Sequence, residues 1–340
     1  MSRLTLSVSR DYYIIPKSRV PRTSSLPLVT QTFMAQPQAP PHPPVLEIRT
    51  PAMNVCVCWS PCGGYLTFGC LGHGVYVTDV PAHLDHIDVW TLRGNAYRYV
   101  SWSPDGGGLV SCDTTGVAWV WNWRGQEVVR KLMGTPRDWI SSIGWSPRGG
   151  KIAASVGVKS HLTVWDACTG NILGQSACSP VGLINTLSWS PTGLVVATAS
   201  TDKMVRVWDS ATCRQRGGPL EGHRDSVQTL SWSSTGSMLA SGSKDDTVRL
   251  WDVRTGKGGV RLLRDHRGEV RSIHWSRDGL TVNSTCVYGH LYTWCIRTGK
   301  LLAHTRLLER VVVSADWSPD GRRLAMTSDD GSVRVWSTSG

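Results

Sequence analysis

The chain has 340 residues and a formal net charge of +11, with 36 Lys and Arg residues against 25 Asp and Glu residues. It shows no apolar run long enough for a transmembrane helix and no apolar N-terminal stretch typical of a secretory signal. We therefore expect an intracellular protein of the cytoplasm or nucleus that does not contact membranes. Its 10 cysteines are then expected to be reduced thiols rather than a disulfide framework.

The first 43 residues differ in composition from the rest of the chain. They are rich in Ser, Pro, Gln and Thr, and the proline-rich run 36–44 follows at their end. Such a segment cannot bury enough apolar surface to offset its ordering entropy, so residues 1–43 are predicted to be a disordered tail. Residues 1–25 hold many Arg and Ser and the single acid Asp11, but we do not favour organellar targeting on this basis.

After this tail, the pair Trp-Ser stands at seven regularly spaced positions, at intervals of 43, 43, 44, 43, 43 and 42 residues. A second Trp follows 19 or 20 residues after six of the seven pairs, and Thr78 stands in its place in the first copy. The first members of the seven pairs are Trp59, Trp102, Trp145, Trp189, Trp232, Trp275 and Trp317. A unit repeated at this period predicts one large repeat domain over residues 44–340.

Each copy of the unit has the pattern of several short strands. In the fifth copy, residues 227–232, 238–243 and 247–252 alternate between apolar and polar side chains, and turns rich in Ser, Gly and Asp separate them. A looser fourth strand is expected near residues 260–263. Because Gly222-His223 precedes the first strand and Trp251-Asp252 closes the third, the copy resembles the WD40 repeat.

The resemblance implies an all-β fold, a seven-bladed β-propeller of four-stranded antiparallel blades. The seventh copy reaches only its third strand before Gly340, whereas residues 45–50 precede the first copy and alternate like a strand. We predict that this N-terminal strand completes the last blade and closes the ring, which removes an exposed sheet edge.

The family pattern also implies a structural hydrogen-bond network of a His, a Ser or Thr, an Asp and a Trp within a blade. The fifth copy alone supplies every member, as His223, Ser241 or Ser243, Asp245 and Trp251. A His, a Ser and an Asp together suggest a catalytic triad, but a nucleophile needs an exposed oxygen with oxyanion donors nearby. We therefore interpret the network as structural, and we expect the protein not to be an enzyme.

Other copies depart from this pattern in the turn between the second and third strands. Asp113, Asp202 and Asp329 keep an acidic turn without a matching His, whereas residues 286–290 replace that turn in the sixth copy. Either these blades are less stable, or their loops are shaped to contact a partner.

We predict no metal site and no cofactor. Four cysteines cluster in the first copy, at positions 56, 58, 62 and 70, but neither paired Cys-x-x-Cys motifs nor His ligands accompany them.

Four Trp residues fall outside both regular series, and Trp139 is the informative one. Packing within the blades accounts for Trp90, Trp119 and Trp123, whereas Trp139 stands in the loop that enters an innermost strand, six residues before Trp145. Comparable loop positions carry Tyr97, Arg98, Arg137, Asp138, Arg224, Arg267 and Arg310. Aromatic and Arg side chains are typical of interface anchors. The alternative is that Trp139 folds over the channel mouth as a plug.

We expect a scaffold that binds a protein or peptide, acidic in character, and that acts as a monomeric propeller within a larger complex. A second hypothesis rests on Trp251-Asp252-Val253-Arg254, which resembles the motif by which some WD40 proteins dock on cullin-RING ubiquitin ligases. Asp252 and Arg254 would form that adaptor surface. A third is a basic scaffold in an RNA or chromatin assembly, since the net charge favours nucleic acid, although no nucleic-acid motif is present.

Overall fold

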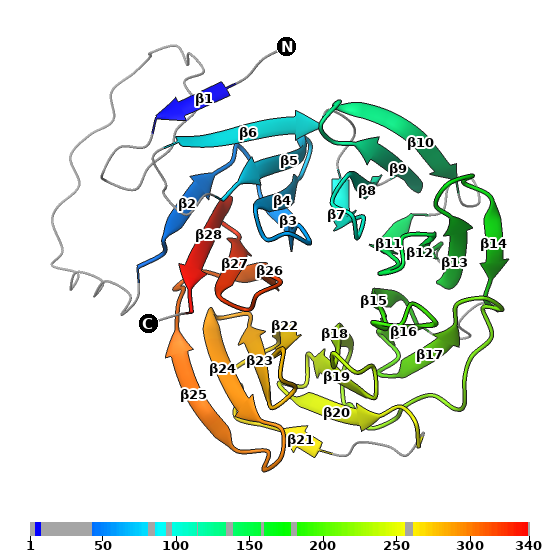
Figure 1. The fold of residues 1–340 in the computed structure, drawn as a ribbon. Coiled ribbons are helices and arrows are strands. Elements are labelled where there is room, and N and C mark those ends of the chain that lie inside the picture. Colours follow the sequence, from blue (N-terminus) through cyan, green and yellow to red (C-terminus); the bar gives the residue numbers. More distant parts are fainter. Residues whose placement is uncertain are drawn as a thin grey trace, which may run out of the picture.

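The structure, a computed structural model, describes residues 4–7, 43–80, 86–92, 97–113, 115–133, 139–157, 160–177, 182–255 and 261–338. Within these ranges, 28 strands form seven antiparallel sheets and no residue belongs to a helix. The sheets stand like blades around a central opening (Figure 1). The chain is therefore a seven-bladed β-propeller, as the sequence predicts.

The chain enters each blade at the centre of the ring and proceeds outwards. The innermost strands are β3 (Asn54–Trp59), β7 (Tyr97–Trp102), β11 (Ile140–Trp145), β15 (Ile184–Trp189), β18 (Val227–Trp232), β22 (Val270–Trp275) and β26 (Val312–Trp317). The second strands are β4 (Tyr65–Cys70), β8 (Gly108–Asp113), β12 (Lys151–Val156), β16 (Val195–Ser200), β19 (Met238–Ser243), β23 (Thr281–Cys286) and β27 (Arg323–Ser328).

The outer half of each blade is more variable. The third strands are β5 (Gly74–Asp79), β9 (Val117–Asn122), β13 (His161–Asp166), β17 (Val205–Asp209), β20 (Val248–Asp252), β24 (His290–Cys295) and β28 (Ser332–Ser337). The outer strands are β6 (His86–Leu92), β10 (Glu127–Met133), β14 (Ile172–Gln175), β21 (Arg261–Leu263) and β25 (Leu301–Arg306). In blade 4, isolated bridges from Leu220 to Val205 and from Gln215 to Trp208 replace a regular fourth strand.

The strand β2 (Leu46–Arg49) is the outer strand of blade 7. It pairs antiparallel with β28, and Leu46 and Ile48 bury their side chains against the sheet. An ion pair of 3.0 Å joins Glu47 to Arg334 across the pairing. Figure 1 shows the blue strand β2 beside the red strand β28 in one blade. This pairing confirms the predicted closure of the ring.

One further strand was not expected. Residues Leu4–Ser7 form β1, which pairs with β6 as a fifth strand on the outside of blade 1 (Figure 1). The sequence predicts disorder throughout residues 1–43, so these four residues differ from that expectation. Almost all of the remaining tail lies outside the described residues.

The two members of the Trp-Ser pair have separate structural roles. The indole Nε1 of Trp232 donates to the carbonyl oxygen of Ser188 in the preceding blade at 3.0 Å, and Trp275 donates to Ser231 in the same way. The Ser hydroxyl instead accepts an amide within its own turn, as in the 3.0 Å bond from Met238 to Ser233. The repeat is thus visible in the sequence because it links blades and fixes turns.

Blade 1 has Thr78 where the other blades have a Trp, and Thr78 is fully buried. Its cross-strand partners Leu66 and Val89 pack in the core between blades 7 and 1. On the other side of blade 1, an aromatic cluster faces blade 2 and consists of Tyr65, Trp90, Trp102 and Trp123, with the rings of Tyr65 and Trp123 4.7 Å apart. These contacts explain Trp90 and Trp123 as packing residues, as expected.

Candidate functional site at the channel mouth

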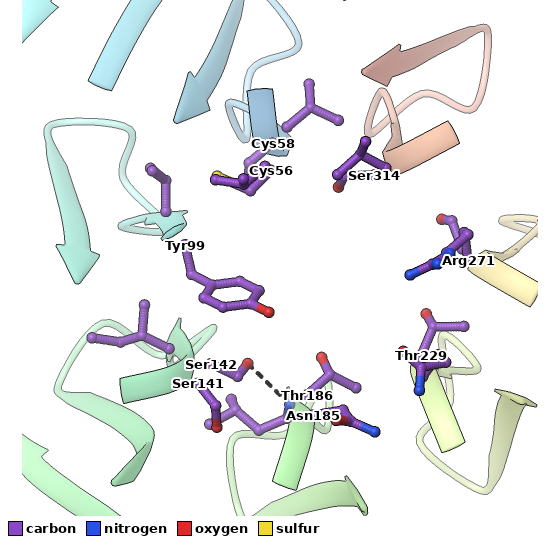
Figure 2. A pocket seen from close by; sticks show the side chains of 18 of the residues that line it. Cys56, Cys58, Tyr99, Ser141, Ser142, Asn185, Thr186, Thr229, Arg271 and Ser314 are labelled. Atoms are coloured by element: carbon purple, nitrogen blue, oxygen red, sulfur yellow. Dashed lines mark hydrogen bonds between the residues drawn. The ribbon is translucent and has the colours of Figure 1, made fainter. Parts of the chain in front are cut away.

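A cavity of about 750 Å³ runs along the axis of the propeller, and residues of all seven innermost strands line it. Its walls carry many small polar side chains, among them Ser141, Thr229 and Ser314 (Figure 2). Tyr99 and Arg271 extend into the opening from opposite sides in the same view. Arg271 is held by an ion pair of 3.0 Å with Glu269. The channel is therefore polar and suited to water rather than to an apolar ligand.

We define the rim position as the residue six places before the Trp of each Trp-Ser pair. Its carbonyl oxygen accepts a hydrogen bond from an amide in the turn between the second and third strands of its own blade. These bonds have lengths of 2.8 to 3.1 Å and fix Met53, Trp139, Leu183, Ser226, Glu269 and Val311. The seventh rim residue, Ala96, lies outside the described residues. The ring therefore holds the backbone of its rim on the face that we call the loop face.

The side chains at the rim divide it into two parts. Met53, Trp139 and Val311 are large apolar residues that are 37%, 45% and 39% exposed. Ser226 and Glu269 make the rim polar in blades 5 and 6. Trp139 lines the cavity and keeps nearly half of its surface open to solvent. An aromatic side chain in this position can be covered by a partner at little entropic cost.

The other predicted contact residues are only partly described. Arg224, Arg267 and Arg310 are exposed in the loops that enter blades 5, 6 and 7, so they share the loop face with Trp139. Within the described residues, none of the three side chains forms an ion pair. Arg137 and Asp138 lie outside the described residues, and for Tyr97 and Arg98 the structure gives only their place in β7.

Tyr288 belongs to the same face, although sequence reasoning did not select it. It is 55% exposed, and its ring lies against Gly268, where a Cβ would come within 2.7 Å. The amide of Val312 donates to the carbonyl of Val287 at 2.8 Å, which links this turn to the rim at Val311. The irregular sequence of residues 286–290 was the signal that could have identified Tyr288.

The expected network forms in blade 5, and its geometry resembles a catalytic triad. Asp245 Oδ2 lies 2.9 Å from His223 Nδ1, and His223 Nε2 lies 2.8 Å from the hydroxyl of Ser241. That hydroxyl also accepts the indole N–H of Trp251 at 2.7 Å, and Ser241 has no exposed surface. A nucleophile needs access to substrate, so these groups stabilise the blade instead. Ser243 lies outside this chain of bonds and donates to the carbonyl of Ser226 at 3.0 Å.

The carboxyl group of Asp245 stays ionised in this network. Burial raises its pKa, but hydrogen bonds from His223, Thr247 and the amide of Arg224 outweigh burial and hold the pKa well below its usual range. The acid that performs this role in blade 7 is Asp330, which accepts bonds from Ser328 and Ser332. Asp329, the acid that the sequence suggests for this turn, lies one residue earlier in the chain.

The alternative adaptor surface lies at the opposite end of the blades, where the third strands finish. Arg254 follows β20, and its guanidinium is 3.6 Å from the carboxylate of Asp252. A groove of about 240 Å³ between blades 4 and 5 is lined by Arg254, Val253 and the exposed Leu194. The motif therefore borders an accessible, partly apolar depression.

The described residues give no indication of a metal centre. No group of three His, Cys, Asp or Glu side chains within them is arranged to hold a metal ion, and the nine cysteines described are free thiols. Nor does this part of the chain contain a helix long and apolar enough to cross a membrane.

Seven blades surround a polar channel, and hydrogen bonds fix the rim on one face. The family WD40, described as WD domain, G-beta repeat, matches residues 172–209, 213–252 and 294–337. The chain thus carries WD40 repeats in three places and folds as a seven-bladed β-propeller. Propellers of this family are generally scaffolds for protein interactions and are typically not enzymes.

Proposed function

We propose that this protein is a non-enzymatic scaffold that binds a protein or peptide on its loop face, with Trp139 as the central anchor. The observation that carries the proposal is the half-exposed Trp139 on a backbone fixed to the next turn by a 2.9 Å hydrogen bond from Gly157. Because the rim is rigid, little conformational entropy is lost when a partner covers it. One aromatic anchor can then carry much of the affinity.

The charge around the rim indicates the chemistry of the partner. Arg224, Arg267 and Arg310 are exposed and form no ion pairs within the described residues, and the whole chain has a net charge of +11. An apolar residue flanked by acidic groups would complement this face. The propeller would act as one monomeric subunit of a multiprotein complex.

Affinity purification of the wild type, Trp139→Ala and Leu173→Ala tests this proposal. Leu173 is the matched control, because it is 46% exposed but lies on the outer strand β14. We expect Trp139→Ala to lose at least one partner that Leu173→Ala retains, with affinity reduced by about 2 kcal/mol or more. Identical partner sets for all three proteins would reject Trp139 as an anchor.

A ligase-adaptor function is the second candidate, and the groove beside Arg254 favours it. In that case, Arg254→Ala would abolish binding of the adaptor while Trp139→Ala would not. If neither substitution removed a partner, both surfaces would be wrong. Binding that decreases steeply with salt, and that ribonuclease abolishes, would favour the RNA assembly instead.

A further inference from the structure

Three blades carry an arginine at the same place in the third strand. Arg206, Arg249 and Arg334 each lie four residues after an Asp in the preceding turn. In blade 4, Nη1 of Arg206 lies 2.8 Å from Oδ2 of Asp202, and in blade 7, Nη2 of Arg334 lies 3.2 Å from Oδ2 of Asp330. The shape of this turn therefore brings the Arg and the Asp together as an ion pair.

Blade 5 departs from this arrangement because its Asp is already engaged. Oδ2 of Asp245 lies 2.9 Å from His223 Nδ1 and accepts the backbone N–H of Arg224 at 2.7 Å. Oδ1 accepts the amide and the hydroxyl of Thr247 at 3.1 and 2.5 Å. Arg249 consequently forms no ion pair within the described residues, and its Nε is buried without a hydrogen-bond partner.

Two further arginines lie near Arg249. Its guanidinium lies against Gly222, where a Cβ would come within 2.6 Å of Nη1, and the exposed Arg224 follows two residues later. On the other side, Arg249 pairs in register with Leu262 of β21, and the exposed Arg264 again follows two residues later. Arg224 and Arg264 therefore flank Arg249 at the outer part of the loop face of blade 5, near enough for their charges to act on it.

The electrostatics agree with this geometry. Burial lowers the pKa of the Arg249 guanidinium most. Among the neighbouring charges Asp245 has the largest effect and raises this pKa, whereas Arg264 and Arg224 lower it. Asp225 and Asp265 follow two of these arginines in the sequence, but neither forms an ion pair with them within the described residues. Three arginines therefore lie near the carboxylate of Asp245, and the excess of positive charge favours an anion from outside the chain.

We propose that Arg249, Arg224 and Arg264 bind a phosphate monoester, carried by a phosphorylated Ser or Thr of the partner on the loop face. Such a group carries a charge of about −1.5 to −2 and three acceptor oxygens, which several guanidinium groups can bind in a bidentate manner. A carboxylate offers one charge and two oxygens. The assignment of the phosphate to the partner on the loop face rests on the proposed function. The site is close to the rim, because Arg224 stands two residues before the rim residue Ser226.

Fluorescence anisotropy with short labelled peptides tests the site in the full chain. The probes are a degenerate pool with a central phosphoserine, the same pool with Ser, and the same pool with Glu. We expect the wild type to bind the phosphoserine pool at least tenfold more tightly than the other two. Arg249→Gln should lose this preference and the exposed Arg264→Gln should weaken it several-fold. Arg206→Gln, at the same strand position in blade 4, should retain it.

Several results would overturn the proposal. If Arg249→Gln and Arg206→Gln bound the phosphoserine pool equally well, the arginine cluster would not be the cause of the preference. If the wild type bound the Glu pool as tightly as the phosphoserine pool, it would have no preference for phosphate. Inorganic phosphate that competes as strongly as the phosphoserine pool would indicate a free-anion site. An oligouridine that binds more tightly than any peptide, and depends on Arg249, would indicate nucleic acid.

The peptide assay is independent of the anchor at the channel mouth. If Trp139→Ala retains every partner but the Arg249 dependence holds, the anchor proposal fails and the phosphate site stands. If the Arg249 dependence is absent while Trp139→Ala loses a partner, only the phosphate site is wrong.

Discussion

The backbone amide of Trp59 donates a 2.8 Å hydrogen bond to the carboxylate of Asp316, which joins the first blade to the last. The indole of Trp59 also donates to the Asp316 carbonyl oxygen at 3.2 Å. At another blade interface, the amide of Trp145 donates to the hydroxyl of Ser101 at 3.0 Å. The seam of the ring thus uses an ionisable acceptor where a hydroxyl serves elsewhere, and burial raises the pKa of Asp316 to about 6.

This carboxyl group should make the stability of the ring depend on pH. Its pKa is higher in the folded state than in the unfolded chain, so folding is favoured by protonation and stability decreases as pH rises from about 4 to about 6. Asp316→Asn keeps an acceptor oxygen for Trp59 but removes the charge. We expect the stability of Asp316→Asn relative to the wild type to increase by about 2 kcal/mol between pH 4.5 and pH 7.

The measurement is the free energy of chemical unfolding of both proteins at the two pH values. His266 and His274 have pKa values that burial lowers to about 4, so they act in the opposite direction, but both proteins contain them. Parallel pH profiles for the two proteins would show that Asp316 does not titrate in the folded state.

Two histidines allow the role of Asp245 in the blade network to be tested. His266 contacts Ser284 at 2.7 Å much as His223 contacts Ser241, but no acid completes its network. His223→Ala leaves the largely buried carboxylate of Asp245 without its ring partner. It should therefore cost about 1 to 2 kcal/mol more than His266→Ala, measured by chemical unfolding at neutral pH. Equal costs would mean that packing of the rings outweighs the bond to Asp245.

Removal of the closing strand should be far more damaging than removal of the tail before it. Deletion of residues 1–50 takes away β2 and leaves β28 as an open edge in blade 7. We expect this protein to aggregate on gentle heating, as seen by light scattering. Deletion of residues 1–40 removes β1 but keeps β2 and should leave the protein monodisperse. Similar behaviour of the two truncations would contradict the importance of the closure.

Trp139 offers a direct comparison between an anchor and a plug. As an anchor that is 45% exposed, it contributes little to folding, so Trp139→Ala should change the free energy of unfolding by no more than about 0.5 kcal/mol. Trp165, which has no exposed surface, should cost about 3 to 5 kcal/mol when replaced by Ala. A large loss of stability in Trp139→Ala would indicate instead that its side chain closes the channel mouth.

The fold could be predicted because the repeated residues have fixed physical tasks. A Ser that caps its turn recurs in every copy, and its Trp is packed at the blade interface, where the indoles of Trp59, Trp189, Trp232 and Trp275 donate to the preceding blade. The spacing of these pairs therefore reveals the number of blades. Closure by β2 could also be predicted, because the alternation of residues 45–50 matched the strand absent from blade 7. By contrast, β1 and the irregular outer segment of blade 4 have no repeating pattern that would identify them.

The candidate site was less accessible to sequence reasoning. Trp139 could be selected because it interrupts a regular series. The irregular turn 286–290 pointed to Tyr288 only weakly, because the exposure of this side chain depends on how the turn packs against Gly268. Arg249 was overlooked for a similar reason. Its sequence context matches that of Arg206 and Arg334, and only the three-dimensional competition of His223 for Asp245 distinguishes it.

The pairing of β2 with β28 also determines the order in which the molecule can assemble on the ribosome. Glu47 and Arg334 are separated by 287 positions, so at typical rates of translation roughly 15 to 60 s pass between their syntheses. During this interval, the earlier blades can form one after another as an open arc, while β2 has no partner.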